Sequence, residues 1–228
     1  MKVKLSVCIT CFNKEEYIDE AVKSITDQTV KPIEIILVHD GCQNPAHHPL
    51  CKTLILPKNT GVANARREAA KMASGALLLF LDGDDKLSPN FIEETVRLME
   101  KADVAYPDML WWYQGMGDNK YVYSPDKLLA KDMYNTCKIP VSCVMKRRVF
   151  DGLGGFRQLE LYEDWDFWLR AMEAGYKFKR ANTFLWYRQF PNTRNRQNKE
   201  LKQEIYKKIR NQFVLSKGKI CPRLSTTS

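Results

Sequence analysis

An almost continuous apolar run at residues 33–38, Ile-Glu-Ile-Ile-Leu-Val, stops at His39-Asp40-Gly41. A strand with one face in solvent alternates apolar and polar residues, whereas a strand covered on both faces reads as a continuous apolar run. Parallel sheets are covered in this way because the helices that connect their strands pack on both faces. The run therefore predicts a central strand of a parallel sheet, followed by a turn.

Three further segments predict strands, at residues 3–11, 53–56 and 76–81. Helical periodicity occupies residues 14–26 and 62–73, where apolar side chains recur on one face. Strand and helix thus alternate along the first part of the chain. This order predicts an α/β fold with a parallel sheet and right-handed crossovers.

The alternation becomes irregular after a helix that Ser88-Pro89 opens and that we expect to run to about residue 101. A strand is expected at 103–106, and the aromatic, Gly, Pro and Asn residues of 107–140 favour hairpins and loops. Helical patterns return at 164–174 and 197–214. At 228 residues and 44% hydrophobic composition, the chain is expected to form one domain.

Polar groups follow three of the predicted strands: residues 10–13 (Thr-Cys-Phe-Asn), Asp40-Gly41 and Asp82-Gly83-Asp84-Asp85. Ligands of open α/β sheets bind where strands end at their carboxyl edge. Three carboxylates within four residues repel one another unless a hard divalent cation or water screens them. The sequence therefore favours a cation site at 82–85 over the alternative that these acids only cap the next helix.

Cysteine usage and hydropathy bear on the compartment. Seven scattered cysteines favour a reducing compartment, for which we expect the cytoplasm, over a disulfide framework. No apolar run approaches the roughly 20 residues of a membrane-spanning helix, so we expect a soluble or peripheral protein. A zinc site is disfavoured because Cys8 and Cys11 should point to opposite faces of their strand; the other residues considered for it are Cys42, Cys51, His47 and His48.

The net charge of +9 is concentrated near the C-terminus. From Arg188 to Arg223 the chain has eleven Lys or Arg and two Glu, and the remaining 25 basic and 25 acidic residues cancel. This segment suits an anionic partner, which leaves donor phosphates, an acidic lipid surface at the inner face of a membrane, and nucleic acid as alternatives. The solvated face of a terminal helix is a further alternative.

Residues 5–41, 59–85 and 154–178 together resemble, in order and spacing, the successive signatures of family-2 (GT2) glycosyltransferases of the GT-A type. The resemblance covers roughly residues 3–188. It implies a GT-A fold: a Rossmann-like, mostly parallel sheet flanked by helices, with a C-terminal acceptor-side region. Within it we expect a nucleotide-sugar-binding half at 1–106, an acceptor-side and catalytic-base half of the same domain at 107–190, and a basic helix and tail at 191–228.

The resemblance also implies a donor site for a nucleoside diphosphate sugar, with a UDP-sugar as the expected donor. Thr10, Phe12 and Asp40 match positions that hold the base and ribose, and Arg66 matches an arginine near the base or phosphates. Asp82 would face the ribose or sugar.

On the same basis, Asp84 would ligate the Mn²⁺ or Mg²⁺ that bridges the pyrophosphate. Asp164 matches the catalytic base of inverting members, and Glu163 would orient the acceptor or the base. These roles agree with the chemistry, because sugar transfer must neutralise a leaving diphosphate and take a proton from the acceptor hydroxyl. For residues 163 and 164 the alternative is an acidic pair that stabilises a helix N-terminus.

Two positions depart from the family pattern. His39 stands where an acid is often found, and Phe190 stands where a metal- or phosphate-binding His is often found. For the second departure two alternatives are open: metal affinity is weaker, or Arg188, Arg194 and Arg196 bind the diphosphate instead. Trp165 is a further candidate for acceptor contact, although Trp165 and Trp168 also suit a helix core; Trp111 and Trp112 would line an acceptor groove or pack.

The resemblance thus implies an inverting hexosyltransferase that transfers a sugar to a hydroxyl of a saccharide or lipid-linked acceptor, in polysaccharide, lipopolysaccharide or glycolipid synthesis. Two alternatives stay open: transfer to modified nucleobases in DNA, and a catalytically silent nucleotide-binding module. A Rossmann dehydrogenase is disfavoured because Gly-x-Gly-x-x-Gly is missing after the first strand.

Overall fold

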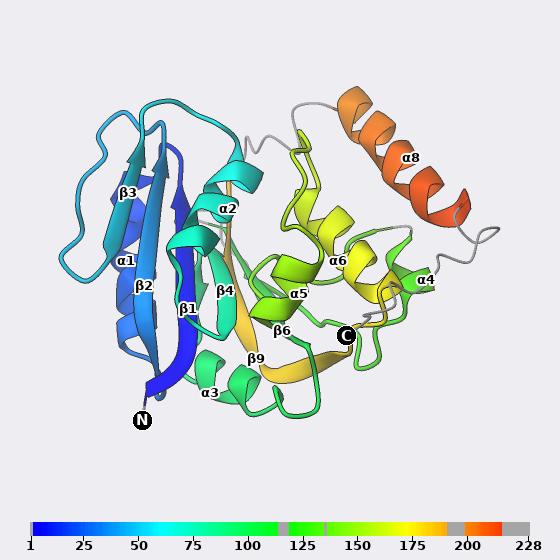
Figure 1. The fold of residues 1–228 in the computed structure, drawn as a ribbon, viewed down its shortest axis with the longest axis horizontal. Coiled ribbons are helices and arrows are strands. Elements are labelled where there is room, and N and C mark those ends of the chain that lie inside the picture. Colours follow the sequence, from blue (N-terminus) through cyan, green and yellow to red (C-terminus); the bar gives the residue numbers. More distant parts are fainter. Residues whose placement is uncertain (1, 114–118, 135, 191–198, 216–228) are drawn as a thin grey trace, which may run out of the picture.

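The computed structural model describes residues 2–113, 119–134, 136–190 and 199–215. Nine strands of these residues form one sheet, with the order β3-β2-β1-β4-β8-β6-β9-β5 and with β7 paired to β6. Helices cover both faces of the sheet, and the C-terminal helix α8 lies at the end of the molecule that carries α6 (Figure 1).

The first half of the sheet is parallel and confirms the strand pattern of the sequence. It consists of β3 (Lys52–Leu56), β2 (Lys31–Asp40), β1 (Lys2–Cys11) and β4 (Leu77–Asp82). The connections include a short 3₁₀ helix at Glu15–Tyr17, α1 (Ile18–Thr26) and α2 (Val62–Met72). Since the four strands run in one direction, their polar ends meet at one edge of the sheet.

The second half of the sheet mixes directions. Next to β4, the antiparallel strand β8 (Val144–Lys146) leads to β6 (Val104–Tyr113), which pairs in parallel with β9 (Phe178–Gln189). The short strands β5 (Lys86–Leu87) and β7 (Lys120–Val122) pair antiparallel with β9 and β6. The β6–β7 pair agrees with the expected hairpin, whereas the sequence patterns did not predict β8 or β9.

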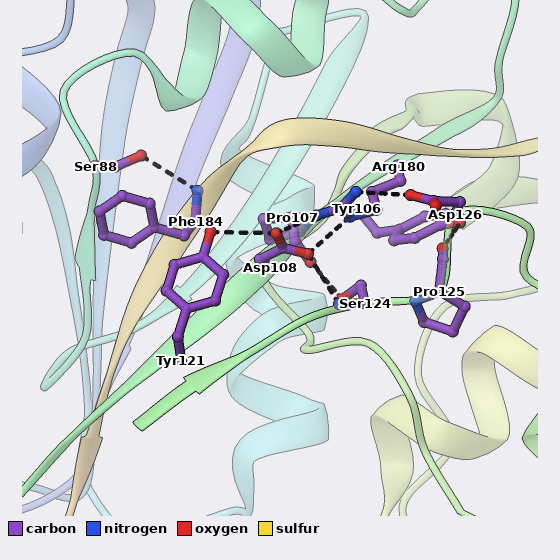
Figure 2. Close-up of polar contacts among 10 residues, drawn as sticks. All are labelled: Ser88, Tyr106, Pro107, Asp108, Tyr121, Ser124, Pro125, Asp126, Arg180 and Phe184. Carbon is purple, nitrogen blue, oxygen red and sulfur yellow. Dashed lines mark hydrogen bonds and ion pairs between the residues drawn. The ribbon is translucent and has the colours of Figure 1, made fainter. Parts of the chain in front are cut away.

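A buried carboxylate fixes β6 to β9 and to the segment that follows β7. Asp108 of β6 accepts hydrogen bonds from the Arg180 guanidinium of β9, at 2.8 Å from Nε, and from the backbone N–H of Ser124, at 2.8 Å. The Tyr121 hydroxyl donates to the same carboxylate, and Arg180 also pairs with Asp126 (Figure 2). Because Asp108 is 2% exposed and fully partnered, this network positions the hairpin beside the rest of β6.

The remaining helices are α3 (Phe91–Val96), α4 (Ala130–Met133), α5 (Arg147–Gly152), α6 (Glu163–Glu173) and α8 (Lys199–Leu215). The expected helix to residue 101 was too long: α3 ends at Val96, and tighter turns such as Met99 N–H to Val96 C=O follow it. Helix α8 buries Ile205, Ile209 and Phe213 in the core that also contains α6. No helix in the described residues is both long and apolar enough to cross a bilayer.

Two apolar clusters lie on the opposite faces of the sheet. Cys8 belongs to the cluster beneath α2 and α6, and Cys11 belongs to the cluster beneath α1 and α3. The expectation that these two thiols point to opposite faces is confirmed.

Candidate functional site

A cavity of about 500 Å³ opens at the carboxyl edge of the parallel strands. Its walls come from the ends of β1, β2 and β4, the first turn of α2, strand β6, the loop before α6 and the first turn of α6. The structure brings together eight of the residues singled out from the sequence: Thr10, Phe12, Asp40, Arg66, Asp82, Asp84, Glu163 and Asp164. Residues of distant chain segments thus line one cavity.

Asp40 shapes the wall at the start of α2. One of its carboxylate oxygens accepts hydrogen bonds at 2.7 Å from both the backbone N–H and the hydroxyl of Thr60. Gly41, the next residue, turns the chain with φ +71°. A Cβ at this position would lie 2.1 Å from the backbone nitrogen of Asn59, so only glycine allows the two segments to approach so closely. Asp40 therefore fixes the loop before α2 while lining the cavity.

The end of β1 presents an aromatic face beside this loop. Phe12 is 46% exposed although it is a large apolar residue. The next residue, Asn13, has φ +51°, which is uncommon outside glycine. The turn keeps the ring at the rim of the cavity, where a planar base could stack on it.

Arg66 joins the two halves of the site. Its guanidinium donates to Asp82 at 2.7 Å and to Glu163 at 2.5 Å. Arg66 is only 2% exposed, so both charge-assisted bonds are largely protected from water. Thr10 Oγ1 also lies 3.4 Å from Asp82. The end of β4 and the N-terminus of α6 are therefore held at a fixed separation.

The acidic segment after β4 carries concentrated negative charge. Burial and the neighbouring Asp82 raise the pKa of Asp84 to about 6, and burial together with Asp84 raises the pKa of Asp85 well above its usual range. The ammonium group of Lys14 lies 3.8 Å from Asp84 and offsets part of this charge. A carboxylate whose ionisation is opposed in this way suits a hard divalent cation, so the residues present fit Mn²⁺ or Mg²⁺.

Asp85 and Arg188 support the cluster from inside the fold. The backbone N–H of Arg188 donates to Asp85 at 2.9 Å, and its guanidinium donates to the Asp84 carbonyl at 2.9 Å and to Glu20 at 3.0 Å. Arg188 is 4% exposed and does not line the cavity. The structure therefore gives Arg188 a supporting position instead of the expected phosphate contact, while Arg194 and Arg196 lie outside the described residues.

The first turn of α6 carries the expected base. Glu163 is tied to Arg66, whereas the contact recorded for Asp164 is a 2.8 Å bond from the N–H of Trp165. Burial and the neighbouring Glu163 raise the pKa of Asp164 to about 7. The preceding residue, Tyr162, is in the left-handed region with φ +65°, a strained conformation for a non-glycine residue. The chain therefore aims a weakly acidic carboxyl group at the cavity.

The tryptophans of α6 belong to the core. Trp165 is 1% exposed, its indole N–H donates to the Met133 carbonyl, and its ring packs 4.9 Å from that of Tyr206. Trp168 is fully buried and donates to the Pro140 carbonyl. The expectation that Trp165 contacts the acceptor is therefore wrong, because its ring is buried and cannot reach a ligand in the cavity. Trp111 of β6 does line the cavity.

Two cavity residues were missed from the sequence. Lys14 packs its ammonium group 3.3 Å from the ring centre of Phe190 while it approaches Asp84. Tyr187 lies among the carboxylates, and burial followed by the charge of Asp85 raises the pKa of its hydroxyl. Lys14 follows the polar residues 10–13 and Tyr187 precedes Arg188, both of which were singled out from the sequence. The directions of their side chains depend on the pairing of β9 with β5, which the sequence did not predict.

Comparison with known proteins identifies relatives of this chain. The family model described as "Glycosyl transferase family 2" matches residues 6–154. The "Uncharacterized glycosyltransferase YwdF" of Bacillus subtilis is 29% identical over 192 residues, which cover 78% of this chain and 71% of that protein. In Escherichia coli, the "UDP-Glc:alpha-D-GlcNAc-diphosphoundecaprenol beta-1,3-glucosyltransferase WfaP" is 28% identical over 186 residues, with 78% and 74% coverage.

Solved structures support the same fold. The crystal structure of S. aureus TarS 1-349 in complex with UDP-GlcNAc superposes with a TM-score of 0.70 at 16% identity, and the match covers 93% of this chain and 72% of that one. The matched family model spans more than half of the sequence, and the sheet has the mixed, mostly parallel GT-A arrangement. The chain belongs to glycosyl transferase family 2.

Proposed function

We propose that the protein is an inverting hexosyltransferase that transfers the sugar of a UDP-sugar to an acceptor hydroxyl, with a bound Mn²⁺ or Mg²⁺. The observation that carries the proposal is one cavity lined on its donor side by Asp40, Asp82 and Asp84 and on its other side by Asp164. Asp84, which would hold the cation of the leaving diphosphate, and Asp164, which would accept the proton, thus face the same cavity.

The donor-side residues suit a nucleoside diphosphate. Phe12 offers a stacking face for the base, and Asp40 and Thr10 offer polar atoms at the carboxyl ends of neighbouring strands. Asp84 would hold the cation, which when bound would supply positive charge to the leaving diphosphate. The UDP-GlcNAc complex of the structurally similar TarS, and the UDP-Glc named for WfaP, support a UDP-sugar as donor.

The acceptor step assigns the base role to Asp164. As the acceptor oxygen forms its bond to the anomeric carbon, its O–H proton passes to the Asp164 carboxylate, and the bond from the anomeric carbon to the diphosphate oxygen breaks with its electron pair. A pKa of about 7 suits a group that must accept a proton near neutral pH. Glu163 stays paired with Arg66 and holds the turn that carries the base.

The same ion pairs argue for one displacement instead of two. A retaining enzyme of the double-displacement type needs a carboxylate nucleophile close to the anomeric carbon. Asp82 and Glu163 are both held by Arg66, and Asp40 is held by Thr60. With Asp82, Glu163 and Asp40 engaged in these contacts and Asp164 as the base, we favour direct displacement with inversion at the anomeric carbon.

The proposed acceptor is a saccharide or a lipid-linked intermediate at a membrane. WfaP is named for transfer to a sugar on a diphosphoundecaprenol lipid, which supports a saccharide or lipid-linked acceptor and a place at the inner face of a membrane. The basic C-terminal segment would then contact anionic lipid from the cytoplasmic side.

The proposal is tested by incubating the protein with UDP-, GDP- and dTDP-sugars, with and without Mn²⁺, and measuring nucleotide release. We expect release from a UDP-sugar that requires the metal, and a product of inverted configuration by proton NMR. Asp164→Asn should lower transfer by roughly 10²–10⁴, whereas Asp27→Asn, an exposed acid outside the cavity, should not. Metal-independent turnover, or a product that retains configuration, would contradict the proposal.

A further inference from the structure

A second cluster of ligand atoms adjoins the donor side of the cavity, and one of its members, Cys11, is part of the cavity lining. Cys11, His39 and Cys42 each place one potential metal-ligand atom so that all three lie within 4.8 Å of one another. Cys11 ends β1 and His39 precedes the last residue of β2, and the two are register partners on neighbouring parallel strands. Partners in register point to the same face of a sheet, so the fold itself brings this thiol and this imidazole together.

The turn after β2 adds the third group. Gly41 adopts φ +71°, and the chain then directs the Cys42 thiol back toward β1, where it lies 3.2 Å from the Cys11 carbonyl and 3.6 Å from the Cys11 sulfur. Cys42 Sγ also lies 3.4 Å from His39 Nδ1. The same turn therefore brings Cys42 to both other ligands.

These distances match the edges of a tetrahedral zinc site. Zinc–sulfur bonds of about 2.3 Å and zinc–nitrogen bonds of about 2.0–2.1 Å at tetrahedral angles separate two sulfurs by about 3.8 Å and a sulfur and a nitrogen by about 3.6 Å. The observed separations are 3.6 Å between the two sulfurs and 3.4 Å between Cys42 Sγ and His39 Nδ1, and the third pair, Cys11 and His39, lies within 4.8 Å. A cation would therefore fit without large movement of the backbone.

The imidazole already has the outer contact that metal-binding histidines usually have. His39 Nε2 lies 3.0 Å from the Ala46 carbonyl oxygen, which accepts a hydrogen bond only if Nε2 carries the proton. The lone pair is then on Nδ1, the atom that faces Cys42. His39 is 2% exposed, so this orientation is held by packing.

We propose that Cys11, His39 and Cys42 form a binding site for a thiophilic divalent cation such as Zn²⁺, separate from the acidic segment at 82–85. Binding releases the two thiol protons to solvent, and water or the nearby Glu15 carboxylate, which accepts a bond from the Asn44 N–H, completes the coordination. The site clamps the ends of β1 and β2. Thr10, Phe12 and Asp40 adjoin its ligands in the sequence, so metal loading stiffens the donor side of the cavity.

The site is tested with Co²⁺ as a spectroscopic probe and Zn²⁺ as a competitor, on reduced full-length protein stripped with a chelator. We expect one equivalent of Co²⁺ to give thiolate-to-cobalt charge-transfer and tetrahedral d–d bands that Zn²⁺ abolishes. Cys11→Ser and Cys42→Ser should each lose about half of the charge-transfer intensity, because one of two thiolates is removed. His39→Asn should weaken Co²⁺ binding by more than the roughly 10–100-fold that loss of an outer-shell partner causes.

The matched control is Cys51→Ser. Cys51 is also half-buried beside a histidine, with its sulfur 3.7 Å from His48 Nδ1. Among the described residues it does not belong to a group of three potential metal ligands. This variant should bind Co²⁺ like the wild type. Absence of stoichiometric binding, equal spectra for wild type and Cys42→Ser, or isolation of the protein as a Cys11–Cys42 disulfide without metal would overturn the proposal. None of these readouts requires sugar transfer, so the result is independent of the proposed activity.

Discussion

The pH dependence of transfer follows from the environment of Asp164. Burial, and then the neighbouring Glu163 carboxylate, raise its pKa from 3.8 to about 7. A base accepts the acceptor's proton only when it is ionised, so activity is lost as pH falls through this pKa. With a pKa of about 7, roughly one tenth of the groups are ionised at pH 6 and roughly nine tenths at pH 8. The value of kcat/KM should therefore rise about tenfold between these pH values.

Glu163→Gln tests the second cause directly. The substitution keeps an oxygen that accepts the Arg66 hydrogen bond but removes the negative charge beside Asp164. The pKa of Asp164 should fall, while burial, the largest cause, keeps it above 3.8. The rising limb of kcat/KM should consequently move to lower pH, even if the plateau is also lower. Asp27→Asn serves as the control and should leave the limb in place.

The assay measures the initial rate of transfer between pH 5 and 9, as kcat/KM for the donor. It is run at two Mn²⁺ concentrations, because Asp84 has a pKa of about 6 and its titration should respond to the metal whereas that of Asp164 should not. A flat wild-type profile, a limb that persists in Asp164→Asn, or a limb that moves to higher pH in Glu163→Gln would refute the reasoning.

Three further predictions concern the metal, the stability and the basic helix. Asp84→Ala should abolish Mn²⁺-dependent UDP binding in calorimetry while the melting temperature stays within a few degrees of wild type, and unchanged affinity would remove Asp84 as a ligand. Asp164→Asn should raise the melting temperature at pH 8 but not at pH 4. The pKa of Asp164 is about 7 in the folded protein, so this carboxyl group ionises first in the unfolded chain and stability falls between about pH 4 and pH 7. The amide that replaces the carboxyl group does not ionise, so the substitution removes this loss of stability. Replacing the exposed Lys207 and Lys208 of α8 by Gln should weaken low-salt binding to anionic liposomes without changing donor hydrolysis. A larger loss of affinity for DNA than for liposomes would favour a nucleic acid partner.

The sequence by itself determined the parallel half of the fold. Strands β2 and β4 are covered on both faces, so each appears as a local apolar run whatever its neighbours are. The apolar and β-branched residues of 3–11 mark β1 in the same local way. The carboxyl ends of parallel strands share one edge, so the sequence alone predicts that Asp40 and residues 82–85 lie together. Motif order and spacing then predicted the family, which the family model confirmed.

In the second half of the sheet, where strand directions are mixed, pairing between distant segments decided which residues form strands. Strand β9 pairs with β6, which ends about sixty-five residues before β9 begins. Residues 181, 183 and 185 of β9 are buried in alternation, but its sequence does not alternate apolar and polar residues, so the pairing and not the sequence pattern reveals the strand. The same applies to Arg188, which the sequence suggested as a phosphate contact but which the approach of β9 to β5 buries against Asp85.

Pairings of charged and ligating groups were likewise settled only by tertiary structure. Arg66 lies 97 residues from Glu163 in the sequence, and only their packing shows that one guanidinium holds both Glu163 of α6 and Asp82 of β4. Cys11 and His39 read as unrelated residues until the register of β1 with β2 makes them neighbours. Local periodicity fixes which way a side chain points along its own strand, but contact between two chain segments depends on register and turn conformation, which no single segment contains.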